Sequence, residues 1–167
     1  MPYEYSEDNL IEQTAIDLFF NQLGWDTLLA YNKEGFGEGS TLGRLNKKEV
    51  VLKKIFFEKI KEFNPNLPEQ AYNQAYEKLI EESINYEKHQ LLRNGISVDF
   101  INEKGEQVKN KTLKVFDFDN ADNNNFLAVR QLWIQGKSNR ERRPDIIGFV
   151  NGIPLLFIEL KAAHRKL

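Results

Sequence analysis

The sequence predicts an α/β protein in which a mixed β-sheet is flanked by helices. Helical periodicity dominates the first half of the chain, and short apolar segments with strand patterns dominate the second half. The chain has 167 residues, 41% of them hydrophobic, so it is long enough to bury one core. We therefore expect a single domain over residues 1–167, helical over residues 1–93 and rich in strands over residues 94–167.

Three amphipathic segments have helical periodicity: residues 6–23, 46–63 and 68–92. Ser6 is the expected N-cap of the first segment, and an apolar stripe that includes Leu10 and Leu18 follows it. In the second segment Asn46 and Glu49 have the spacing of a capping box. The third segment begins at a proline, which the first turn of a helix accepts, and we expect it to be continuous.

Five later segments have the pattern of strands: residues 96–101, 113–118, 126–134, 146–150 and 153–160. The first two flank the polar turn Glu103-Lys104-Gly105, which indicates a hairpin. The last two are almost entirely apolar, as strands covered on both faces are. The Asn151-Gly152 pair between them indicates a second hairpin.

Composition excludes several classes of protein. Without cysteine, the chain has no disulfide framework, no thiol nucleophile and no cysteine-based zinc site. No apolar run approaches the length of a membrane span and no secretory signal opens the chain, so we expect a cytoplasmic protein with no membrane association. The net charge of -2 argues against a protein that is basic overall.

Positive charge is nevertheless concentrated near the end of the chain. Between residues 130 and 143, five basic side chains accompany a single acidic one, Glu141. The basic residues are Arg130, Lys137, Arg140, Arg142 and Arg143. Such a cluster is suited to phosphate, and the last four are candidate DNA-binding residues. The alternative is a solvated charged loop.

The two apolar strands of the second hairpin are bracketed by Asp145, Glu159 and Lys161. Residues two apart in a strand share a face, so the side chains of Glu159 and Lys161 should lie roughly 6.5–7 Å apart along it. A two-residue turn would place Asp145 opposite Ile158, on the other face. A three-residue loop, which we expect, places it opposite Glu159. Pro154 cannot donate a ladder hydrogen bond, which also favours a wider loop or a bulge there.

Two converging carboxylates repel each other unless they share a proton or a cation. A site made only of oxygen ligands selects a hard ion, so we expect Asp145 and Glu159 to bind Mg²⁺, which also accepts phosphate oxygens. The ion would polarise a phosphate and acidify a water, and Lys161 could orient or deprotonate that water. The alternative is a surface hairpin that ends in a salt bridge between Glu159 and Lys161.

These residues carry a family resemblance. Pro144-Asp145 followed by Glu159-Leu160-Lys161 resembles the PD-(D/E)-x-K nuclease signature. Residues 142–161 as a whole resemble the nuclease core of type I restriction enzyme R subunits, including its Asn-Gly-hydrophobic-Pro turn. The resemblance extends over nearly the whole chain, back to the segment from Glu12 to Trp25.

The resemblance implies the nuclease domain of an enzyme of the class called type I site-specific deoxyribonucleases. Such a domain needs Mg²⁺ and itself cuts double-stranded DNA without sequence specificity. It also implies that Glu12 reaches the catalytic site from the helical side. In such proteins, motor domains translocate the DNA. These motor domains are not in these residues, and only they require ATP. Methylation and specificity subunits complete the complex. The resembled fold continues beyond the Glu-x-Lys strand, so we expect a C-terminally truncated nuclease core. The alternatives are a repair nuclease of the same superfamily and a DNA-binding or assembly module without activity.

Overall fold

The computed structural model describes residues 7–30, 34–136 and 138–161. Its Cα positions group into two compact units. One is built from the described residues up to Leu52 together with those from Phe126 onward, and the other is Lys53–Asn125. No helix in the described ranges is long and apolar enough to cross a membrane. All the predicted site residues belong to the first unit.

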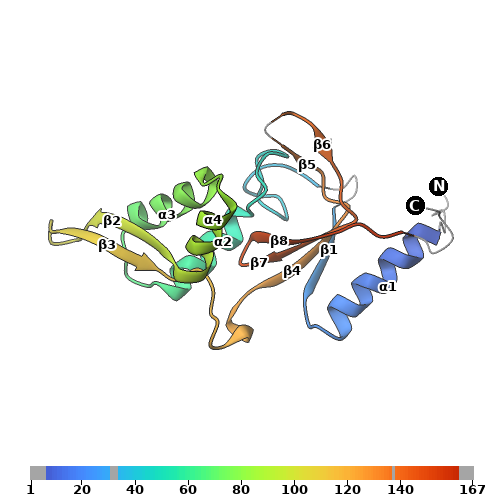
Figure 1. The fold of residues 1–167 in the computed structure, drawn as a ribbon, viewed down its shortest axis with the longest axis horizontal. Coiled ribbons are helices and arrows are strands. Elements are labelled where there is room, and N and C mark those ends of the chain that lie inside the picture. Colours follow the sequence, from blue (N-terminus) through green and yellow to red (C-terminus); the bar gives the residue numbers. More distant parts are fainter. Residues whose placement is uncertain (1–6, 31–33, 137, 162–167) are drawn as a thin grey trace. The chain divides into compact units, whose positions relative to one another are not determined.

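A four-stranded sheet forms the centre of the first unit, and Figure 1 shows its strands side by side. Its strands, in spatial order, are β1 (Asp26–Leu29), β4 (Phe126–Arg130), β7 (Ile146–Val150) and β8 (Ile153–Ile158). The first pair is parallel and the other two pairs are antiparallel. The mixed sheet of the predicted α/β class is therefore confirmed.

Helix α1 (Glu7–Asn21) packs on this sheet through Ile16 and Phe19, which join a cluster with Ala128 and Ile146. The predicted apolar stripe is partly wrong, because Leu10 and Leu18 are 54% and 45% exposed. The buried line of the helix is rotated slightly and contains the carboxylate of Glu12 instead. The predicted N-cap, Ser6, lies outside the described residues.

The outer strand β8 departs from its prediction. We expected both faces of this apolar segment to be covered, yet Leu155 and Phe157 are 49% and 53% exposed. The neighbouring strand β7 is buried along almost its whole length. Of the two apolar segments, only the inner one is therefore covered as predicted.

A small second sheet in the same unit consists of β5 (Ile134–Gln135) and β6 (Glu141–Arg142). The predicted strand 126–134 is thus two strands, because Gln131 adopts a positive φ of 56° and ends β4. The predicted helix 46–63 begins only at Lys53. Residues 46–52 instead form turns with both local and tertiary backbone bonds. The Glu49 N–H donates to the carbonyl of Asn46 at 3.3 Å, and the Leu52 N–H donates to the carbonyl of Gly152 at 2.7 Å.

The second unit contains three helices and a hairpin. Its elements are α2 (Lys53–Phe63), α3 (Glu69–Glu81), α4 (Asn85–Asn94), β2 (Ile96–Ile101), β3 (Gln107–Leu113) and the single 3₁₀ turn η1 (Ala121–Asn123). Apolar side chains from both helices and strands are buried in it: Phe56, Ile60, Ala75, Leu79, Val98 and Leu113.

Two predictions for this unit are wrong in detail. The third helix, which we expect to be continuous, is broken after Glu81, and a new helix begins at Asn85. Between them the Glu82 carboxylate accepts the N–H of Ile84 at 2.7 Å. The hairpin partner of β2 is residues 107–113 rather than 113–118. The turn at Gly105 is tight, so pairing resumes at once, along a segment whose side chains are mostly polar and exposed.

Candidate active site

The β7–β8 hairpin sets the positions of the two predicted metal ligands. Asn151 and Gly152 both have positive φ, 51° and 78°, as the two-residue type I′ turn requires. The register then shifts by one residue, because Phe149 pairs with Pro154 whereas Gly148 pairs with Leu156. Leu155 is therefore the extra residue of a β-bulge. The three-residue loop predicted from the sequence is wrong, and the bulge that Pro154 also favoured takes its place.

The bulge decides which residues face each other at the end of the hairpin. Ile146 pairs with Ile158, and continuing this register by one residue places Asp145 across from Glu159. Opposite residues of an antiparallel pair share a face, so the two carboxylates have a common side. The backbone N–H of Leu160 donates to Oδ2 of Asp145 at 2.6 Å, which fastens this side chain to the end of β8.

A third carboxylate, Glu12, approaches the same place from α1. Its Oε2 is 3.3 Å from Nη2 of Arg130, and its Oε1 accepts a short hydrogen bond from Nε2 of Gln131. The same Nε2 lies 3.4 Å from Oδ1 of Asp145. The side chain of Gln131 thus joins Glu12 on the helix to Asp145 on the sheet.

Burial raises the pKa of Glu12 above its ordinary value of 4.5. The ion pair and hydrogen bond with Arg130 oppose this shift, and the negative charge of Asp145 adds to it. Desolvation is the largest of these causes, so the carboxylate is held in a site that disfavours its charge even with Arg130 beside it.

Asp145 is half-buried just before β7, whereas Glu159 and Lys161 are exposed just after β8. Within the described ranges no group of three or more acidic or histidine side chains is arranged to hold a metal ion. The remaining donor set is the pair Asp145 and Glu159. Mg²⁺ commonly takes one or two protein carboxylates and retains several waters, so this pair fits such an ion.

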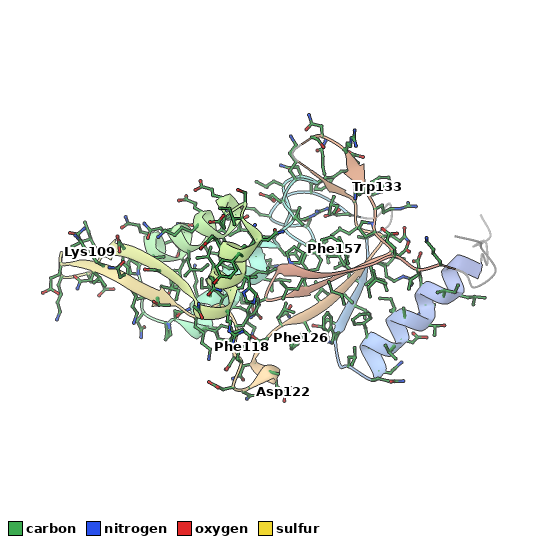
Figure 2. All side chains as sticks on the ribbon, in the orientation of Figure 1. Lys109, Phe118, Asp122, Phe126, Trp133 and Phe157 are labelled. Atoms are coloured by element: carbon green, nitrogen blue, oxygen red, sulfur yellow. The ribbon has the colours of Figure 1, made fainter. Side chains whose placement is uncertain are left out.

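The predicted DNA-binding residues belong to the β5–β6 hairpin and the chain that leaves it. Arg140, Arg142 and Arg143 are exposed, and Lys137 lies outside the described residues. Arg143 nevertheless stacks on Trp133, labelled in Figure 2, with its guanidinium 5.2 Å from the ring centroid. Its position is therefore more constrained than that of the other two arginines.

The side chains of two basic residues, Lys47 and Arg44, fix the base of this hairpin. Lys47 lies 5.1 Å from the centroid of the Trp133 ring and forms an ion pair with Glu141 at 3.0 Å. Arg44, whose side chain is fully buried, donates to the backbone carbonyl of Trp133 at 2.8 Å and pairs with Glu34 at 2.6 Å. The hairpin is thus anchored to the loop that precedes α2, while the exposed arginines remain available to solvent.

No role was predicted from the sequence for Gln131 or Arg44. One signal was present for the first: Arg130 and Gln131 are two polar residues in an otherwise apolar segment, between Val129 and Leu132. Arg44 stands in a glycine-rich loop with no periodicity, so nothing in its surroundings predicts that it is buried.

Comparison with known proteins gives a consistent family. Residues 4–167 match the family described as the N terminus of the type I restriction enzyme R protein. Over 165 residues the chain is 34% identical to the type I restriction enzyme HindI endonuclease subunit of Haemophilus influenzae. The aligned region covers 95% of this chain and 15% of that protein. Over 173 residues it is 31% identical to a candidate type I restriction enzyme MjaIXP endonuclease subunit of Methanocaldococcus jannaschii, covering 94% of this chain and 15% of that protein. The chain thus spans about 15% of the length of these relatives.

Proposed function

Because the chain belongs to the family of type I restriction enzyme R protein N-terminal regions, we propose that it is the Mg²⁺-dependent endonuclease domain of a type I restriction system. It hydrolyses phosphodiester bonds of double-stranded DNA without sequence specificity, after ATP-driven translocation by other domains of the full-length protein. The proposal is supported above all by the β7–β8 register, in which Ile146 pairs with Ile158 and which, continued by one residue, would put Asp145 across from Glu159.

In this proposal Asp145 and Glu159 hold the metal ion, which, when bound, offsets phosphate charge and makes a water more acidic. Lys161 follows Glu159 by two residues, and its ammonium orients the attacking water and offsets the charge that develops on the phosphate. Glu12 is committed to Arg130 and Gln131, so it acts on the site through these partners rather than as a free ligand.

The basic hairpin provides the DNA contact. Arg140 and Arg142 are exposed and two residues apart, and Glu141 between them is paired with Lys47. Together with Lys137 and Arg143, they bind the phosphate backbone and so place the duplex without reading its bases. The methylation and specificity subunits of the complex supply sequence recognition.

The proposal is tested with the full-length protein assembled with its partner subunits. Asp145→Asn and Lys161→Met should each abolish linearisation of a plasmid that carries the recognition site, while ATP hydrolysis continues at the normal rate. Asp119→Asn removes an exposed acid of the second unit and should cut normally.

Normal cutting by Asp145→Asn would remove that residue from the site. If the unmodified complex hydrolyses ATP but does not cut in Mg²⁺, the chain is a binding or assembly module instead of a nuclease.

A further inference from the structure

Gln131 has a backbone conformation that few side chains adopt. Its φ is 56°, in the left-handed region that non-glycine residues enter only where the surrounding structure imposes it. Its N–H donates to the carbonyl of Asp145 at 3.0 Å, and the carbonyl of the preceding Arg130 accepts the N–H of Ala30 at 3.0 Å. The backbone at the end of β4 is therefore fixed to the two neighbouring strands just where the chain turns.

This turn aims the amide of Gln131 at two carboxylates. Carboxylate oxygens only accept hydrogen bonds, so the amide nitrogen and not the oxygen must face Glu12 and Asp145. The nitrogen has two protons, one for each acid. Together with the Leu160 N–H, it contacts both oxygens of Asp145 from the protein side. Each carboxylate oxygen has a second lone pair, with which it could bind a cation.

The charges of the two neighbouring donors differ in a way that suits a metal site. Arg130 is a cation, and it pairs with Glu12. Gln131 is neutral, so it can orient Asp145 without cancelling the negative charge that attracts a divalent ion. An arginine or lysine in its place would compete with the metal for the same carboxylate.

We propose that Gln131 is a positioning residue of the nuclease site, and that its amide holds Asp145 in the orientation that binds the metal while it ties the site to Glu12 on α1. This inference rests on the proposed function, because it takes Asp145 as a metal ligand. Partners that orient a ligand commonly change metal affinity or activity by about 10–100-fold when they are removed.

The test uses the full-length protein without nucleotide and measures Mn²⁺ binding by the electron paramagnetic resonance of the free ion. Mn²⁺ stands in for Mg²⁺ because both prefer oxygen ligands. Gln131→Met removes the amide but keeps the length of the side chain, and Gln131→Gly removes the side chain and relaxes the left-handed backbone. Both should weaken the Mn²⁺ site that Asp145→Asn abolishes, by about 10–100-fold. Gln22→Met, an exposed position beyond α1, should leave it unchanged.

The same variants are then assayed for plasmid cutting in the assembled complex. The Mg²⁺ concentration for half-maximal cutting should rise by the same factor, with the rate at saturating Mg²⁺ largely recovered. Unchanged metal dependence in both variants, or a defect in Gln131→Met that Gln131→Gly does not share, would overturn the role of the amide. If the unmodified complex neither cuts nor binds Mn²⁺ through Asp145, the proposed function itself fails and this inference falls with it.

Discussion

Glu12 shows how a single side chain couples α1 to the sheet. Its spacing from Ile16 and Phe19 predicts that it lies near the buried face of the helix, and the structure places it there with 6% exposure. Its partner Arg130, however, is 118 residues away in the sequence. Periodicity can therefore indicate the face of a helix, but the residue that pairs with a buried charge depends on the tertiary fold.

The raised pKa of Glu12 predicts a particular dependence of stability on pH. The folded state binds the proton more tightly than the unfolded state, so the wild-type free energy of unfolding should fall as pH rises from about 4.5 through the raised pKa. Glu12→Gln lacks this titration and should gain stability relative to wild type over that window. Urea unfolding of both proteins at a series of pH values, with EDTA present, measures the difference. A constant difference across the window would contradict the assignment.

At the scale of elements, the loop before α2 is where prediction from sequence was weakest. The side chains of Asn46 and Glu49 do accept local bonds, since Leu45 N–H donates to the Glu49 carboxylate and Lys48 N–H donates to Asn46 Oδ1. These bonds stabilise a turn and not a helix start. The carbonyl of Glu49 accepts from the Arg44 side chain at 3.2 Å, so a side-chain donor takes the place of the helical backbone N–H.

The buried pair of Arg44 and Glu34 should be important for this loop. Arg44→Met leaves the Glu34 carboxylate buried without its cation, and such a loss commonly costs about 3–5 kcal/mol of stability. Replacing both, with Arg44→Met and Glu34→Leu, should recover most of that loss, because no unpaired charge is left behind. Lys47→Met, which breaks an ion pair that is partly exposed, should cost about 0–1 kcal/mol. Equal unfolding free energies for Arg44→Met and for the double variant Arg44→Met/Glu34→Leu would argue against a buried ion pair.

The basic hairpin makes a prediction about DNA affinity. Each phosphate contact that is lost should reduce the slope of log K against log salt by about 0.9 for duplex DNA. The double variant Arg140→Gln/Arg142→Gln should therefore bind less tightly and with a flatter salt dependence. Arg93→Gln/Lys104→Gln removes the same charge from exposed positions of the second unit and should keep the original slope. If both double variants behave alike, the hairpin is a solvated loop.

Elements with a specific sequence signal were predicted correctly, and elements without one were misplaced. The β7–β8 hairpin was found because an Asn-Gly pair between two apolar runs is specific to a tight turn. Its register was less certain, since a one-residue change moves every side chain to the other face, and Pro154 favoured a wider loop and a bulge alike. β3 was misplaced because its Lys, Asn and Thr side chains look like a loop, although a hairpin exposed on one face can be this polar.

The two compact units raise the question of whether the chain unfolds in a single cooperative step. Sequence length predicts one domain, whereas each unit has buried apolar residues of its own, such as Ile146 in the first and Leu79 in the second. Both tryptophans, Trp25 and Trp133, belong to the first unit. Helices α2, α3 and α4 belong to the second unit and α1 to the first, so circular dichroism reports mainly on the second unit and tryptophan fluorescence on the first.

If the 167 residues form one domain, tryptophan fluorescence and far-ultraviolet circular dichroism should report the same urea midpoint. Leu79→Ala should then lower both midpoints together, because a buried leucine in either unit would support the whole. Its expected cost is about 2–5 kcal/mol. Separate midpoints, with the fluorescence transition unmoved by Leu79→Ala, would mean that the units are two domains.

Locating the bound metal ion in the protein would show directly whether Asp145 and Glu159 hold it. Fe²⁺ can replace Mg²⁺ at oxygen sites, and with ascorbate and peroxide it generates radicals that break the backbone close to where it is bound. In the full-length protein without nucleotide, we predict breaks near residues 145 and 159, with a weaker one near residue 131. Excess Mg²⁺ should suppress them and Asp145→Asn should abolish them. Breaks confined to other parts of the protein, or unchanged by Asp145→Asn, would contradict binding of the ion by this pair.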